Sequence, residues 1–153
     1  MRKAEVVLAA VAKGVLAFIV VVVFVYAMGT IVQCLFVLAA LKSAGAQIPL
    51  SVIPRVVWHD LTHQSFYAEG VLVGFGVALP TAALLCRFSK LSQSWVYPLA
   101  GATALAVMLH IFNSNFYGLT FFAGTRGWSG FLSQLAVGAV GGRLFAAVRA
   151  QWP

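Results

Sequence analysis

An uncharged apolar run from Gly14 to Leu41 constrains this chain more than any other feature. A helix rises about 1.5 Å per residue, so the run would be roughly 42 Å long, against roughly 30 Å of hydrocarbon in a bilayer. We therefore expect a membrane-crossing helix. Because it is longer than the membrane is thick, it should tilt or project from the surface.

The composition extends this conclusion to the whole chain. Of the 153 residues, 62% are hydrophobic and 8% are charged, whereas soluble domains carry roughly 25% charged residues. High hydrophobicity also excludes disorder. The net charge of +7 does not indicate nucleic-acid binding, because the basic residues lie at the ends of apolar runs and form no stripe with aromatic side chains. The expected partner is a lipid bilayer, and no nucleic acid.

Three further apolar segments predict an all-α fold, a polytopic four-transmembrane-helix bundle that forms a single membrane domain over residues 1–153. The expected spans cover about residues 14–41, 65–86, 95–112 and 128–148. Prolines break the chain after the first span. Because proline suits the first turn of a helix, Pro54 predicts a short interfacial helix over about residues 54–64.

The basic residues set the expected orientation. If the N-terminus is cytoplasmic, seven of them lie inside, namely Arg2, Lys3, Lys13, Arg87, Lys90, Arg143 and Arg149. Three would lie outside, namely Lys42, Arg55 and Arg126. Because lysine and arginine are enriched in cytoplasmic loops, this bias predicts that both termini are cytoplasmic. The expected location is a bacterial inner (plasma) membrane.

Small residues at four-residue spacing predict which helix faces meet. Membrane helices associate through close contact, which small side chains permit. Such sets occur in three spans at Gly70, Gly74, Ala78, Ala100, Ala104, Gly130, Gln134, Gly138 and Gly142. We expect these faces to pack inside the bundle. Dimerisation through one of them stays open as an alternative.

Polar and ionisable residues gather at the outer ends of the expected spans. An ionisable side chain inside a membrane is costly, so it is a functional candidate by default. Glu69 lies about one turn inside the second span, and pairing with Arg126 or Gln33 is its simplest expected role. The rest of this outer polar cluster comprises Asp60, Asn113 and Asn115.

The histidines suggest a metal site. His59 and His63 are spaced i, i+4, which places both rings on one helix face, as in paired histidine ligands. Glu69 or His110 would complete a site for zinc or copper. Haem would require His110 to pair with another histidine. The alternative is that these histidines bond to loop carbonyls and lipid headgroups.

Several short stretches resemble small, uncharacterised four-span inner-membrane proteins of proteobacteria. These stretches are Gly29-Thr30-Ile31-Val32-Gln33, Leu38-Ala39-Ala40-Leu41, Ile48-Pro49-Leu50 and Ala123-Gly124-Thr125-Arg126-Gly127. The resemblance implies the same topology. It implies no activity, cofactor or residue role.

The sequence leans away from an enzyme. It has no Cys-x-x-Cys, no Gly-x-Ser-x-Gly, no P-loop and no acidic cluster for magnesium. The leading hypothesis is a non-catalytic accessory or assembly subunit of a larger inner-membrane complex, or a small homo-oligomer. One alternative is a metal- or haem-binding redox protein with its site on the outer face. Another is a small transporter or channel that uses Glu69, Gln33 and Asn113.

Overall fold

The protein is all-α, which confirms the expected fold class. The structure is a computed structural model that describes residues 2–89, 91–115 and 122–151. Its elements are α1 (Arg2–Ser43), η1 (Leu50–Val52), α2 (Ile53–His63), α3 (Ser65–Ser89), α4 (Gln93–Asn115), η2 (Ala123–Thr125) and α5 (Trp128–Ala150). Within the described residues, α1, α3, α4 and α5 are long and apolar enough to cross a membrane.

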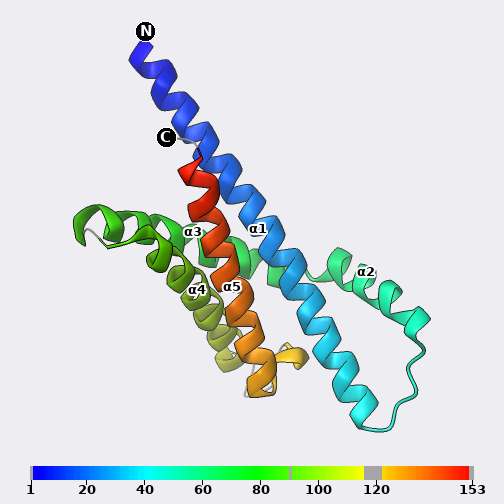
Figure 1. The fold of residues 1–153 in the computed structure, drawn as a ribbon. Coiled ribbons are helices and arrows are strands. Elements are labelled where there is room, and N and C mark those ends of the chain that lie inside the picture. Colours follow the sequence, from blue (N-terminus) through cyan, green and yellow to red (C-terminus); the bar gives the residue numbers. More distant parts are fainter. Residues whose placement is uncertain (1, 90, 116–121, 152–153) are drawn as a thin grey trace.

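Helix α1 is the longest element, and its first turns extend beyond the other helices (Figure 1). It contains no proline, and a helix bonds its own backbone groups, as a chain in lipid must. It ends where Gly45 adopts a φ of 93°, which favours glycine. The Gly45 amide donates to the Lys42 carbonyl and the Ala46 amide to the Leu41 carbonyl, both at 3.1 Å. These two bonds form a Schellman motif that stops the helix.

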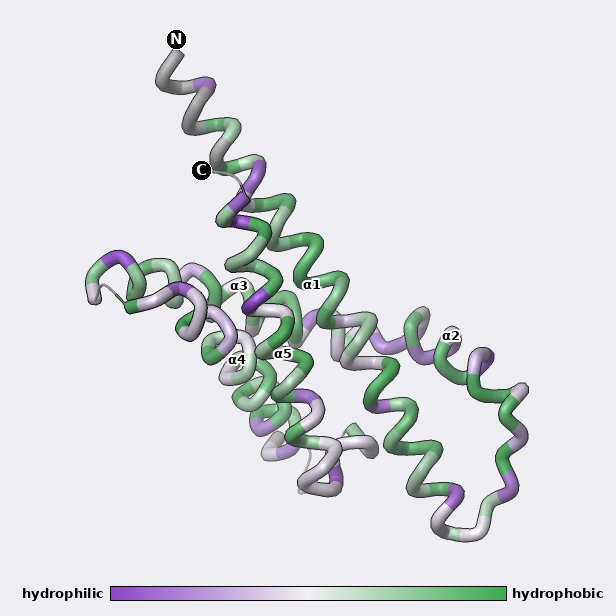
Figure 2. The backbone as a smooth tube through the Cα atoms, in the orientation of Figure 1, coloured by the Kyte–Doolittle hydropathy of each residue, from purple (hydrophilic) through white to green (hydrophobic). Residues whose placement is uncertain are grey.

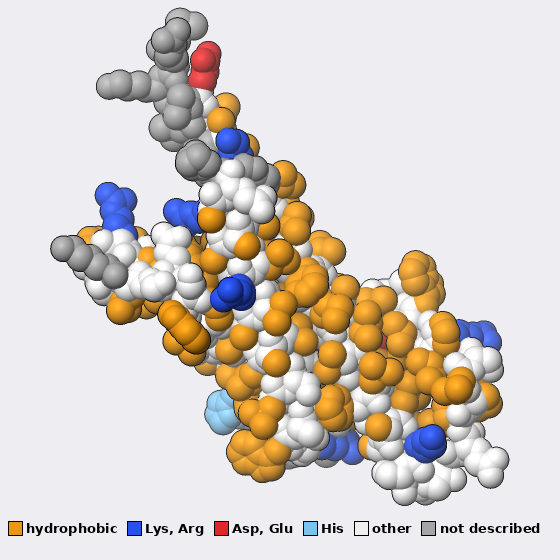
Figure 3. Space-filling model, viewed as in Figure 1, with side chains coloured by type: hydrophobic (Ala, Val, Ile, Leu, Met, Phe, Trp, Pro, Cys, Tyr) orange, Lys and Arg blue, Asp and Glu red, His pale blue; other side chains and the backbone are white. Residues whose placement is uncertain are grey.

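The four long helices pack in the spatial order α1, α5, α4 and α3, and α3 also contacts α1. In Figure 1, α3 passes behind α1, and both termini lie at the same end of the molecule. Hydrophobic residues dominate the long helices (Figure 2), and hydrophobic side chains cover the middle of the face seen in Figure 3. This distribution is that of a protein surrounded by lipid.

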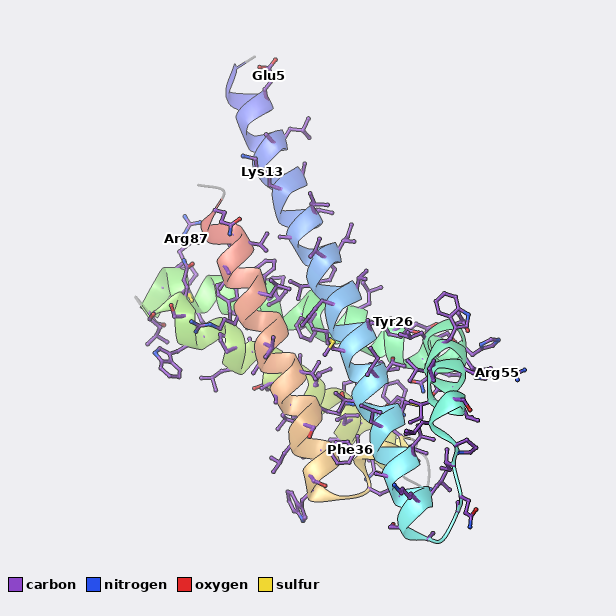
Figure 4. The ribbon with its side chains drawn as sticks, turned by 45° about the vertical axis from the view of Figure 1, so that its right-hand side comes forward. Glu5, Lys13, Tyr26, Phe36, Arg55 and Arg87 are labelled. Carbon is purple, nitrogen blue, oxygen red and sulfur yellow. The ribbon has the colours of Figure 1, made fainter. Side chains whose placement is uncertain are left out.

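Helix α2 is short and amphipathic. Its partly buried residues recur at helical spacing and pack toward α1; they are Ile53, Val56, Val57, Asp60 and Leu61. The Tyr26 hydroxyl on α1 donates a 2.7 Å hydrogen bond to the Leu61 carbonyl. Arg55 lies on the side of α2 that faces away from α1 (Figure 4). Helix α3 then starts at Ser65, after a single non-helical residue, Gln64.

Candidate functional site

A groove of about 850 Å³ runs between α3 and α4. Its floor consists of small or flexible side chains from both helices, namely Gly70, Gly74, Ala78, Ala100, Ala104 and Met108. The helices approach closely at Gly74, where a Cβ would stand 3.6 Å from the Ala104 methyl carbon. Its rim consists of exposed residues spaced by four, namely Glu69, Val73, Val77, Thr81 and Leu85 on α3 and Leu99, Thr103, Val107 and Ile111 on α4. We call this feature the α3–α4 groove.

The groove opens away from the protein core. On α3 the buried face includes Tyr67, Val71 and Phe75, each two residues before a rim position. Two residues correspond to roughly 200° around a helix with 3.6 residues per turn. The rim therefore lies on the face opposite the core, where it meets lipid or another membrane protein.

Glu69 is the ionisable residue that lines the α3–α4 groove. Its side chain is exposed on the rim, close to the N-terminal end of α3. Within the described part of the chain, its carboxylate has no hydrogen-bond or ion-pair partner. The pairing with Arg126 or Gln33 that the sequence suggested is not formed there. An unpaired carboxylate on a lipid-facing surface is the feature of this groove that most needs a chemical explanation.

Gln33 and Arg126 lie in another part of the molecule, near η2. Gln33 is buried, and a Cβ added at Gly124 of η2 would stand 2.9 Å from its Cγ. The Gln33 Oε1 and the Thr30 Oγ1 are buried and have no hydrogen-bond partner among the described residues. Arg126 lines a separate hollow of about 560 Å³, between the C-terminal part of α1 and the start of α5.

The histidines of α2 are brought together on its exposed face. The rings of His59 and His63 stack with their centroids 4.3 Å apart and an interplanar angle of 8°. The Nδ1 of His63 lies 3.0 Å from the His59 carbonyl oxygen and 2.8 Å from the Thr62 hydroxyl. The Nδ1 of His59 lies 3.7 Å from the Asp60 carboxylate.

The other proposed metal ligands are placed on different helices. His110 is an exposed residue of α4, and Glu69 lies on α3. In residues 2–89, 91–115 and 122–151 no three His, Cys, Asp or Glu side chains lie close enough to hold a metal ion. The hypothesis of a zinc or copper site therefore depends on the His59–His63 pair, and haem would still require His110 to pair with another histidine.

The remaining members of the polar cluster lie on two helices, α2 and α4. Asp60 points toward α1, near the Cys34 thiol and the Tyr26 hydroxyl. Asn113 is exposed in the last turn of α4. Asn115 is the last residue of α4, and its side chain lies outside the described part of the structure.

A buried hydrogen-bond chain joins three helices and was not foreseen from the sequence. The Tyr67 hydroxyl donates to the Gln134 Oε1 at 2.7 Å, and the Gln134 Nε2 donates to the Gly29 carbonyl at 2.8 Å. Gln134 is 1% exposed and Tyr67 is fully buried. The chain ties α3 to α5 and α5 to α1. A glutamine among glycines of a membrane span was the available signal, but it does not reveal the partner.

The buried face of α5 consists mainly of glycines and includes Gly130, Gln134, Gly138 and Gly142. A Cβ at Gly130 would overlap the Gly124 carbonyl, and one at Gly142 would overlap the Tyr97 carbonyl. On α4, the residue that contacts Gly138 is Gly101. The four-residue spacing in the sequence pointed instead to Ala100 and Ala104. These two alanines line the α3–α4 groove.

No protein family matches this chain, and no curated protein or solved structure is detectably similar to it. Among the described residues, the α3–α4 groove is a hollow lined by a charged side chain without a partner, Glu69.

Proposed function

We propose that this protein is a non-catalytic accessory subunit of a larger inner-membrane complex, in which the α3–α4 groove receives a transmembrane helix of another subunit. The observation that carries the proposal is the α3–α4 groove itself. It is an apolar surface groove of about 850 Å³ on the lipid-facing side of two membrane-crossing helices. Its volume is comparable to that of a ligand pocket, but its lining offers few polar groups to orient a small substrate.

The length of the groove favours a helix over a single lipid tail. On α3 the rim extends from Glu69 to Leu85, which corresponds to roughly 24 Å at about 1.5 Å per residue. A lipid tail covers one leaflet, about half of the roughly 30 Å hydrocarbon thickness. The rim therefore continues well past the middle of the membrane, as the contact surface of a spanning helix does.

The shape of the groove also suits a helix. Side chains four residues apart form ridges along a helix, and neighbouring helices pack the ridges of one into the grooves of the other. The rims of α3 and α4 are two such ridges, and small residues lie between them. Close approach over small residues is what stabilises helix pairs in lipid.

A second copy of this chain fits the groove less well than a different subunit. A two-fold dimer places the same surface patch of both copies together. If the dimer axis lay along the membrane normal, the two Glu69 carboxylates would face each other at the same depth, and like charges repel strongly in a medium of low dielectric. We therefore assign the groove to another protein.

Filling the groove should disrupt assembly. Val77 is exposed on the rim, and Val140 is a similarly exposed valine on α5 outside the groove. We expect Val77→Trp to lower the fraction of protein in a high-molecular-weight complex about tenfold, or about 1.4 kcal/mol, while Val140→Trp leaves it unchanged. Native gel electrophoresis of detergent-solubilised membranes from the native host measures this fraction. A monomeric wild-type protein, or equal losses in both variants, would contradict the proposal.

The proposed orientation places both termini in the cytoplasm. It is supported by the positions of the termini at one end of the molecule (Figure 1) and by the distribution of basic residues. In a cysteine-free background, Ser51→Cys before α2 should react with a membrane-impermeant maleimide on intact spheroplasts. Ser92→Cys, between α3 and α4, should react only after the membrane is opened. The reverse labelling pattern would invert the topology.

A further inference from the structure

We infer that the helix docked in the α3–α4 groove carries a lysine or arginine that pairs with the Glu69 carboxylate near the outer face of the membrane. This inference rests on the proposed function and names the chemistry of the partner. It starts from the position of Glu69, which is exposed on the rim of the groove and has no hydrogen-bond or ion-pair partner among the described residues.

The lining of the groove offers the Glu69 carboxylate few hydrogen-bond donors and no cation. Apart from Glu69, its lining is apolar except for the hydroxyls of Thr81 and Thr103. Thr81 lies three turns along α3 and donates its proton to the Val77 carbonyl at 2.7 Å. A carboxylate in such surroundings is costly unless a cation or several donors reach it.

The outer basic residues of this chain are placed elsewhere. Arg126 lines the hollow between α1 and α5. Arg55 projects from α2 on the side away from α1 (Figure 4). Lys42 lies in the last turn of α1. None of the three lines the α3–α4 groove, so among the described residues no lysine or arginine of this chain pairs with Glu69.

The depth of Glu69 favours a lysine or arginine on the partner. Glu69 lies about one turn from the start of α3, close to the outer boundary of the span. A long basic side chain near the end of a helix extends its charged group toward the interface and keeps its methylenes in lipid. It can therefore contact the carboxylate and the headgroup region together. Further inward the rim is almost entirely apolar, so the rest of the partner helix is expected to be apolar.

The test compares Glu69 variants in the native complex, with a photo-reactive amino acid at Val73, one turn from Glu69. Glu69→Gln keeps the size and the hydrogen-bonding capacity of the side chain but removes the charge. We expect it to lower the assembled fraction about tenfold, and Glu69→Lys to lower it below detection. Leu72→Gln, at an exposed position of α3 outside the groove, is the control and should assemble normally. Because Glu69 has no partner within the described chain, both Glu69 variants should retain the wild-type unfolding temperature after purification.

The cross-linked peptide identifies the cation. We expect it to come from an apolar segment of another membrane protein that contains one lysine or arginine, and exchange of that residue for glutamate should restore assembly of Glu69→Lys. If Glu69→Gln assembles normally while Val77→Trp does not, the charge pairing is wrong and the docking function stands. If neither variant affects assembly, both proposals fail. A lipid adduct at Val73, with assembly that depends on phosphatidylethanolamine, would identify a lipid ammonium group instead and overturn the inference.

Discussion

A valine at Gly138 should push α4 away from α5 and destabilise the protein by about 3 kcal/mol, near the upper end of the usual cost of overpacking. A Cβ at Gly138 would overlap the Gly101 carbonyl oxygen and approach the Leu105 Cγ to 3.1 Å. The contacted Gly101 atoms belong to the backbone, which cannot rotate aside as a side chain can. The two helices would have to separate along their most extensive contact.

The control for this prediction is Gly76→Val. Gly76 lies within α3, and a Cβ there would find its nearest neighbour, the Phe18 Cζ, at 3.9 Å. The two substitutions change helix propensity alike, so their difference isolates the steric effect. Unfolding by sodium dodecyl sulfate in mixed micelles, followed by circular dichroism, measures both free energies. Equal destabilisation of the two variants would show that the α4–α5 backbone contact does not limit packing.

An alanine at Gly29 should cost about 2 to 3 kcal/mol, because it displaces a buried tyrosine and breaks its hydrogen bond. A Cβ at Gly29 would overlap the Tyr67 hydroxyl and stand 2.8 Å from the Tyr67 Cζ. The tyrosine cannot move freely, since its ring packs 5.3 Å from that of Phe122 and 6.2 Å from that of Tyr26, centroid to centroid. Its bond to Gln134 would be lost with the displacement.

The effect of removing the Tyr67 hydroxyl on the free energy of unfolding should have opposite signs in the wild type and in the Gly29→Ala variant. In the wild type, Tyr67→Phe leaves the Gln134 Oε1 without its donor and should destabilise the protein by about 1 kcal/mol. In the Gly29→Ala background Tyr67→Phe removes the hydroxyl oxygen that would overlap the alanine Cβ, so it should stabilise the protein. A double-mutant cycle on the unfolding free energy measures this coupling. Additive effects would show that Tyr67 does not sit against Gly29.

The outer layer shows why a cluster predicted from topology alone can be incomplete. The expected topology brings Gln33, Glu69, His110 and Arg126 to similar depths, but the angular position of each residue around its helix decides which way it points. Glu69 faces the α3–α4 groove, whereas Gln33 is buried against η2. Hydropathy carries no information on this rotation, because α3 and α5 are apolar on nearly all sides.

The α3–α4 groove also shows how far a sequence pattern can predict helix contacts. The four-residue spacing of Gly70, Gly74 and Ala78 indicated a close-packed face. In the structure Gly70 and Gly74 pack closely against Met108 and Ala104 of α4, and the exposed rim residues beside this contact leave the groove open. Small residues permit close approach, but they do not specify whether the approaching helix belongs to the same chain. The sequence predicts this contact surface, the structure places α4 of the same chain against it, and what covers the open rim stays undetermined.

By itself the sequence determined the membrane class and the all-α fold. These follow from the solvent, because a long apolar segment in lipid has to bond its own backbone and a helix does so locally. Tertiary structure alone decided the rotation and pairing of the helices. It brought Gln134 to Tyr67, which lies 67 residues away, and to the Gly29 carbonyl, which lies 105 residues away. It also left Glu69 on an open groove without a partner among residues 2–89, 91–115 and 122–151. Such pairings depend on shape complementarity between distant surfaces, and no local pattern in the chain encodes which surface meets which.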